Sequence, residues 1–190
     1  TLEETGLDEK TAIVVTADHG TNLGERGGFG KTGIVNEQEA HVPLMVYVPG
    51  GAVGRSDAIV QPQDIATTLL RLGEAQPPEP WVGQDLLEIA ESDGSGAREV
   101  ALAGHSVNSW TDDPDHIIFS VFDREWYMNL AANPEACRLY RYGSVEDVSA
   151  GYPEIVSRFR DIGISEAARR GTDEKLVNWL HSGGALRFPY

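Results

Sequence analysis

The sequence has little of three things on which protein sites often depend: cysteine, lysine and long apolar runs. Cys137 is the only cysteine among the 190 residues. An intramolecular disulfide is therefore excluded, and a cluster of thiolate metal ligands is not expected. No apolar run reaches the roughly 18 residues of a membrane-spanning helix, and the sequence shows no basic-then-apolar signal pattern at its start. We therefore expect no membrane span.

Basic residues are scarce as well. Lysine and arginine together number 15 against 30 aspartates and glutamates, which gives a formal net charge of -15, and the only lysines are Lys10, Lys31 and Lys175. Because this charge repels nucleic acids and anionic membranes, we expect no nucleic-acid partner. An acidic composition poor in lysine also suits high salt, where the screening length falls to about 3 Å near 1 M. We interpret the composition as that of an acidic, halophilic protein.

The first part of the sequence has the pattern of an α/β fold. The β-branched run at residues 11–16 stops at Asp-His-Gly, which predicts a strand buried on both faces, as in a parallel sheet. A second apolar run, at residues 42–50, ends in a Pro-Gly turn, and residues 61–73 have the spacing of a helix that stops at its glycine. The connection between the two strands has about 25 residues, which is too long for a structureless loop in a compact domain unless it is functional.

The second part of the sequence has the pattern of an antiparallel sheet followed by helices. Prolines near residue 78 mark a boundary, so we divide the chain into a first portion at residues 1–83 and a smaller subdomain at residues 84–190. Short apolar runs with a charged turn between two of them predict an antiparallel meander. Its expected strands are 99–106, 116–123, 125–132 and 137–143. Two helices are expected to follow, at 153–162 and 165–181, the second with Ala168, Leu176, Val177 and Leu180 as its inward face.

Asp18 and His19 are the strongest candidates for chemistry. Ligands of α/β proteins bind at the carboxyl ends of the strands, and an Asp oxygen and a neutral His nitrogen both bind divalent metals. Gly20 permits the turn that would let neighbouring residues reach one ion. The alternative is a strand end closed by an Asx-type turn, with a histidine that is only hydrogen-bonded.

Three further basic residues lie in or beside the long connection. Lys31 ends a glycine-rich stretch and could present a compact positive charge to a phosphate or sulfate oxygen. The spacing of that stretch is not that of a P-loop, so nucleotide binding fits poorly. Arg26 and His41 could contact an anion or orient a ligand. The alternative for all three is an ordinary solvated loop position.

Several of these segments, in their order, are similar to a known family. They are "TGLDEKTAIVVTADHGTNLGERGGFGK" at residues 5–31, "HVPLMVYVPG" at 41–50, "DIATTLLRLG" at 64–73, and Gly83 before "QDLLE". The sequence resembles the sulfatases of the alkaline phosphatase superfamily, densely over residues 1–83 and thinly beyond. The resemblance implies an α/β fold: the C-terminal part of an alkaline-phosphatase-like mixed sheet flanked by helices, with a smaller antiparallel α+β subdomain at its end.

The resemblance also implies a site. By match to the family motif, Asp18 and His19 would bind a divalent cation, calcium before manganese, magnesium or zinc. Lys31 would be a catalytic residue that contacts the sulfate, and Arg26 and His41 would be substrate-binding groups. The implied activity is hydrolysis of a small-molecule or glycan sulfate ester. Because related enzymes share Asp-His-Gly, a phosphodiesterase, phosphonate hydrolase or phosphoethanolamine transferase is the alternative.

The sequence departs from the family pattern in what it lacks. The nucleophile motif, a cysteine or serine in a C/S-x-P-S/A-R context, and the early paired acidic ligands are absent, and Cys137 lies in the wrong region. We interpret the sequence as the C-terminal fragment of a sulfatase-like enzyme, incomplete without the N-terminal part of the same protein. A homo-oligomer is a further expectation. An alternative of another class is a non-catalytic interaction or assembly module.

Overall fold

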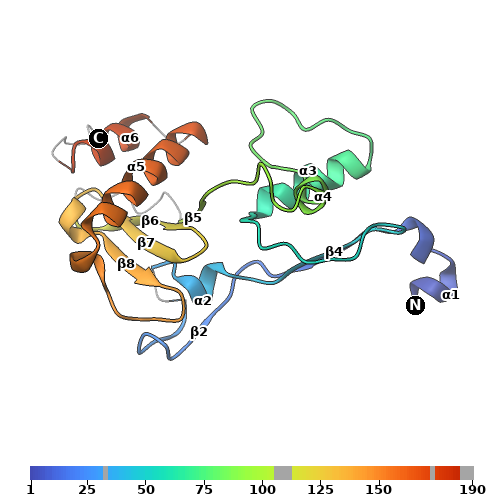
Figure 1. The fold of residues 1–190 in the computed structure, drawn as a ribbon, viewed down its shortest axis with the longest axis horizontal. Helices are drawn as coiled ribbons and strands as arrows, with labels where there is room; N and C mark the ends of the chain where they lie inside the picture. Colours follow the sequence, from blue (N-terminus) through green and yellow to red (C-terminus); the bar gives the residue numbers. More distant parts are fainter. Residues whose placement is uncertain (32–33, 105–112, 172–173, 185–190) are drawn as a thin grey trace. The chain divides into compact units, whose positions relative to one another are not determined.

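The computed structural model describes residues 1–31, 34–104, 113–171 and 174–184 (Figure 1). The chain forms two compact units. Unit 1 consists of residues 1–20 and 41–98, and unit 2 consists of residues 21–40 and 99–190. The predicted border between two domains at residue 83 stays a prediction. Unit 2 consists of two segments, and each of them follows a segment of unit 1 along the chain.

Unit 1 contains a two-stranded ribbon and a pair of helices. The chain begins with α1 (Leu2–Thr5) and the 3-10 helix η1 (Asp8–Lys10). Strand β1 (Ile13–Thr16) pairs antiparallel with β4 (Leu44–Tyr47), so that Ile13 lies opposite Tyr47. Helices α3 (Pro62–Leu72) and α4 (Leu86–Glu91) follow.

The expectation of a parallel, doubly buried strand at residues 11–16 is wrong for the described residues. Val15 is 49% exposed and Met45, its partner on β4, is 58% exposed. A continuous β-branched run predicts a strand, but it does not fix the direction of the partner strand. The strand itself was therefore predictable, and its pairing was not.

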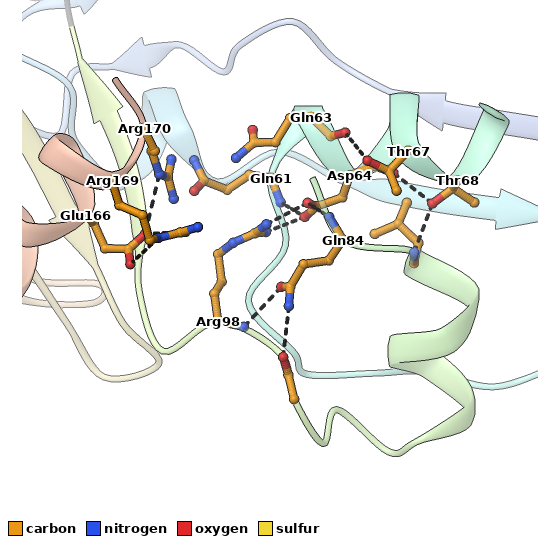
Figure 2. A network of polar contacts seen from close by, with 12 residues as sticks. Gln61, Gln63, Asp64, Thr67, Thr68, Gln84, Arg98, Glu166, Arg169 and Arg170 are labelled. Carbon is orange, nitrogen blue, oxygen red and sulfur yellow. Dashed lines mark hydrogen bonds and ion pairs between the residues drawn. The ribbon is translucent and has the colours of Figure 1, made fainter. Parts of the chain in front are cut away.

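The buried face of α3 is polar (Figure 2). Asp64, Thr67 and Thr68 are at most 2% exposed, whereas Leu69 and Leu72 on the same helix are exposed. One Asp64 oxygen accepts hydrogen bonds from the Gln84 N–H at 2.8 Å and from Arg98 at 2.6 Å. The other accepts from the Gln61 N–H at 2.7 Å and forms a second, closer contact with Arg98.

This network joins the start of α3 to two distant parts of unit 1. The Arg98 side chain is 7% exposed, so its charge is removed from water together with that of Asp64. The Thr68 hydroxyl donates to the Asp64 carbonyl and accepts the Leu86 N–H at 2.9 Å, which holds the start of α4. Gly83 leaves no room for a side chain, because a Cβ there would lie 2.2 Å from the Thr67 hydroxyl oxygen and 2.4 Å from the Gln63 carbonyl oxygen.

Unit 2 is built on a four-stranded antiparallel sheet in the order β5-β6-β7-β8. The strands are β5 (Ala101–Gly104), β6 (Ile117–Phe122), β7 (Trp126–Ala131) and β8 (Arg138–Arg141). The predicted meander is thereby confirmed in order and direction, while residues 105–106 of its first expected strand lie outside the described residues. Short 3-10 helices, η3 (Pro134–Ala136) and η4 (Ser149–Gly151), lie in the connections. The long connection between β1 and β4 adds β2 (Asn22–Leu23), β3 (Phe29–Gly30) and α2 (Glu37–Ala40).

Helices α5 (Pro153–Arg169) and α6 (Glu174–His181) cover one face of the sheet (Figure 1). Gly163 allows α5 to approach closely, because a Cβ there would lie 2.6 Å from a Val121 methyl group. The predicted helix boundary was wrong, since α5 continues through residues 163–169. Ala168 therefore belongs to α5 and is exposed, whereas Leu176 and Leu180 are buried on α6 as expected. No helix among the described residues is long and apolar enough to cross a membrane.

The opposite face of the sheet carries an aromatic cluster. Phe122, Tyr127 and Tyr140 are buried together, and Tyr142 packs against them. The Tyr127 ring stacks on Phe122 and Tyr140 with centroids 5.5 and 5.0 Å away. The Tyr142 hydroxyl donates to the Asp123 carbonyl at 2.7 Å. Burial, followed by the nearby Asp123 charge, raises the pKa of Tyr142, and burial also raises the pKa of Tyr127.

We predict that Asp64→Asn strongly destabilises the chain. The substitution leaves the buried Arg98 guanidinium without its carboxylate, and breaking a buried pair in this way costs about 3–5 kcal/mol. Urea unfolding measures the loss. The matched control is Glu88→Gln, which removes an exposed ion pair of 3.2 Å with Arg71 and should cost under about 1 kcal/mol. A loss for Asp64→Asn no larger than that of the control would contradict the prediction.

We predict that the stability of the chain falls with rising pH above about 10, the ordinary pKa of tyrosine. A pKa raised by folding means that the folded state keeps its proton while the unfolded state loses it. The contribution of Tyr142 is thus complete below the unfolded pKa and is lost as the pH rises through the folded value. Urea unfolding across this range, compared with Tyr142→Phe, should give a flatter pH dependence for the variant. An equally steep variant would show that Tyr142 is not involved.

Candidate functional site

Asp18 and His19 lie at the end of β1, and the local backbone holds the imidazole in place. His19 Nδ1 is 2.7 Å from the carbonyl oxygen of Gly20, and the His19 N–H donates to Asp18 Oδ1 at 2.9 Å. The side chain of Asp18 is 87% exposed and that of His19 is 43% exposed. Because a carbonyl can only accept, this contact places the ring proton on Nδ1 and leaves the lone pair of a neutral ring on Nε2.

This arrangement fits two ligands of one cation. His19 Nε2 lies 3.5 Å from Asp18 Oδ2. Two ligand atoms at that separation can both lie about 2.0–2.2 Å from a single ion, and a ligating histidine ordinarily donates its other ring N–H to a carbonyl or carboxylate. Among the described residues, no group of three or more His, Cys, Asp or Glu side chains surrounds a common point. The structure therefore brings together one pair of potential ligands.

Lys31 directly follows β3 and belongs to unit 2, whereas Asp18, His19 and His41 belong to unit 1. Its side chain is exposed. The backbone before it is fixed, because Asn22 Nδ2 donates to the Gly30 carbonyl at 3.0 Å. His41 follows α2 and is also exposed. The substrate roles of Lys31 and His41 stay predictions.

Arg26 has partners within unit 2. Its guanidinium carbon lies 4.2 Å from the centre of the Tyr140 ring and 5.6 Å from that of Tyr127. One of its terminal nitrogens donates to the Tyr127 hydroxyl. Arg26 counteracts the effect of burial on the pKa of Tyr127, because a nearby positive charge favours the ionised phenol. The arrangement gives Arg26 a packing role, and its predicted substrate role stays a prediction.

Sequence reasoning overlooked a polar network around the Lys31 segment. Asn22, Asn36 and Glu39 are at most 6% exposed. Asn22 accepts from Asn36 Nδ2 at 2.8 Å and donates to Glu39 at 2.6 Å, and Asn36 accepts the Glu39 N–H at 3.2 Å. No periodic pattern predicts the burial of these residues. The one available signal was the length of the connection, which pointed to a structured segment.

Cys137 is 1% exposed, and its sulfur lies 3.6 Å from the carbonyl oxygen of Ala131. A thiol enclosed in this way does not meet solvent or substrate. This placement agrees with the sequence argument that Cys137 is not the nucleophile.

Comparisons with known proteins link the first part of the chain to one family. A family model described as Sulfatase matches residues 1–75. The N-acetylglucosamine-6-O-sulfatase of Bacteroides thetaiotaomicron is 34% identical over 95 residues, which is 49% of this chain and 17% of the relative. Residues 1–75 are thus similar to the sulfatase family. An uncharacterised Escherichia coli sulfatase, YidJ, is 27% identical over 86 residues, or 45% of this chain and 17% of its own length.

Solved structures extend the likeness beyond the matched residues. The structure of BT4656 in complex with its substrate D-glucosamine-2-N,6-O-disulfate has a TM-score of 0.75 at 20% identity, covering 91% of this chain and 37% of BT4656. The phosphonate monoester hydrolase of Silicibacter pomeroyi has a TM-score of 0.71 at 22% identity, covering 88% and 37%. These likenesses confirm the expected fold, the C-terminal part of an alkaline-phosphatase-like α/β protein. The chain spans less than a fifth of the curated relatives and well under half of these solved structures.

Proposed function

We propose that the chain supplies part of the active site of a metal-dependent sulfatase that hydrolyses small-molecule or glycan sulfate esters. The observation that carries the proposal is the pairing at the end of β1, where His19 Nε2 lies 3.5 Å from Asp18 Oδ2 while Nδ1 is engaged by Gly20. The similarity of residues 1–75 to the sulfatase family supports it, because members of that family generally use a divalent cation. The curated relative and BT4656 support the glycan sulfate class, since both are described with sulfated glucosamine compounds.

Asp18 and His19 would hold the cation. The carboxylate supplies a hard oxygen and the imidazole a nitrogen of intermediate softness, a pair that suits calcium, manganese, magnesium or zinc to different degrees. By resemblance calcium is our first candidate. A bound cation would polarise the sulfate ester as a Lewis acid. The hydrogen bond from Nδ1 to the Gly20 carbonyl supports this role, because it would leave Nε2 as the nitrogen that binds the ion.

Lys31 would contact a sulfate oxygen. Its ammonium group is exposed at the end of a structured hairpin, and it is one of three lysines in a chain with a net charge of -15. A positive group aimed at an oxygen stabilises the charge that develops there in the transition state. Because the chain covers 37% of BT4656, we propose that residues outside it supply the nucleophile and the other metal ligands.

We predict that calcium raises the thermal midpoint of the full-length protein through Asp18 and His19. A ligand that binds only the folded state stabilises it by mass action. In a melting series with calcium chloride, Asp18→Asn and His19→Ala should each shift the calcium concentration that is needed by at least about 10- to 100-fold, which is the range for loss of a mere hydrogen-bond partner of a metal ligand. Asp57→Asn, which changes an aspartate whose side chain is 81% exposed, is the control. A shift in Asp18→Asn equal to that of the wild type would contradict the metal role.

We predict that Lys31→Ala lowers kcat/KM for 4-nitrophenyl sulfate by about 10²–10³-fold, the range for loss of one group that stabilises developing negative charge. The assay uses the full-length protein with calcium. Lys10→Ala, at the exposed end of η1, removes the same charge elsewhere and should change kcat/KM by less than about twofold, as surface substitutions usually do. Equal activity of the Lys31 and Lys10 variants would remove Lys31 from the site.

The same assay separates the alternatives. A clear preference for bis(4-nitrophenyl) phosphate over 4-nitrophenyl sulfate would assign the protein to a phosphodiesterase or phosphonate hydrolase type, whose fold this chain shares equally. Hydrolysis of neither ester by a protein that still shows the calcium shift would favour the non-catalytic assembly module.

A further inference from the structure

We propose that the four-stranded sheet of unit 2 positions Lys31, with Tyr140, Ser120 and Asn129 as positioning residues. The inference rests on the proposed function, because the contact of Lys31 with sulfate is itself a proposal. It goes further by naming residues more than 85 positions away in the sequence that act on the reaction through the segment at residues 21–40. All of these residues belong to unit 2.

The first anchor precedes Lys31 in the sequence. The Arg26 guanidinium stacks on the Tyr140 ring at 4.2 Å, and the Tyr127 hydroxyl accepts a hydrogen bond from it. Tyr140 and Tyr127 are at most 8% exposed, so the cation lies against a fixed aromatic surface. A planar guanidinium stacks on such a surface, whereas a lysine ammonium would not. The hairpin β2–β3 is therefore held by β7 and β8.

The second anchor follows Lys31. The carbonyl oxygen of Val35 accepts hydrogen bonds from the Ser120 hydroxyl at 2.6 Å and from Asn129 Nδ2 at 3.1 Å. Asn129 also donates to the Ser120 oxygen at 2.7 Å, and both side chains are at most 2% exposed. These three hydrogen bonds favour one arrangement of the segment. If the Val35 carbonyl moved away, the Ser120 hydroxyl proton and one Asn129 N–H would lose their acceptor.

A third set of hydrogen bonds links these two anchors to the backbone next to Lys31. Asn22 lies opposite Gly30 in the β2–β3 pair and donates to its carbonyl at 3.0 Å. Asn36 donates to Asn22 Oδ1 at 2.8 Å, one residue after Val35. The residue immediately before Lys31 is thus bound to a network that the sheet holds at both ends. Lys31 has a flexible side chain, so a fixed backbone reduces the volume that its ammonium group samples.

A double-mutant cycle in the full-length protein tests this inference with 4-nitrophenyl sulfate. Tyr140→Leu removes the stacking surface, and we expect kcat/KM to fall by about 3- to 100-fold, since a displacement near 1 Å can cost about 100-fold. In a Lys31→Ala background, the same substitution should change kcat/KM by less than about twofold, because residues that act through one group are not additive. Tyr140→Phe keeps the ring and should leave kcat/KM equal to that of its own background, with or without Lys31→Ala.

The outcomes separate the two proposals. If Lys31→Ala lowers activity and Tyr140→Leu lowers it further by its full factor, Tyr140 does not act through Lys31 and the inference is overturned. If Lys31→Ala alone has no effect, the role of Lys31 in the proposed function fails, whatever the sheet does. Ser120→Ala replaces Tyr140→Leu should that variant not fold, because it removes only one hydroxyl and leaves the Asn129 contact with Val35.

A spectroscopic measurement tests the anchoring without reference to activity. A nitroxide attached to Lys31→Cys reports backbone and side-chain motion at that position, and the native Cys137 is too buried to compete for the reagent. Tyr140→Leu and Ser120→Ala should each increase the mobility of the label, and Tyr140→Phe should not. Unchanged mobility in both variants would overturn the inference.

Discussion

The double hydrogen bond to the Val35 carbonyl is the contact on which the arrangement of unit 2 depends. Residues 21–40 join β1 to β4 in the sequence, yet they belong by contact to the antiparallel sheet. Ser120 and Asn129 are buried polar side chains in the middle of an otherwise apolar sheet, and a backbone carbonyl from this segment satisfies them. Without it, the Ser120 hydroxyl proton and one Asn129 N–H would lie buried without an acceptor, at a cost comparable to a lost hydrogen bond each. The segment and the sheet are therefore formed together.

Unit 1 depends on the same kind of interaction. The inward face of α3 holds Asp64 and two threonines in place of leucines. Asp64 and Thr68 bind charge or backbone from other parts of the unit, and Thr67 donates to the Gln63 carbonyl of its own helix. Apolar side chains could fill this space at similar stability, since a buried ion pair recovers little more than its own desolvation cost. The polar side chains add directional hydrogen bonds, which apolar side chains would lack. Asp64 has acceptor sites for Gln61, Gln84 and Arg98 in a single geometry, so the segment at residues 83–98, which includes α4, has one position on the helix.

How far the sequence predicts this structure depends on the range of the interactions involved. The strands of the meander and the start and end of α3 follow from periodicity, turn residues and a helix-stopping glycine, all of which are local. The pairing of β1 with β4 and the continuation of α5 past residue 162 depend on neighbours distant in the sequence, and both expectations failed. For the candidate site, Asp18 and His19 could be predicted because the chemistry is adjacent in sequence. The stacking of Arg26 on Tyr140 could not, because no local pattern connects residues so far apart.

This difference also explains how the likeness to sulfatases is distributed. The family model matches residues 1–75, whereas the structural likeness to BT4656 covers 91% of the chain. A metal ligand or an anion contact requires one residue type at one position, so a sequence motif can identify it. A sheet that serves as a support requires only a twisted surface with a buried face, which many apolar sequences provide. Its specific contacts with the supported segment need only agree with each other. In this chain, Arg26 with Tyr140 and Val35 with Ser120 are such pairs.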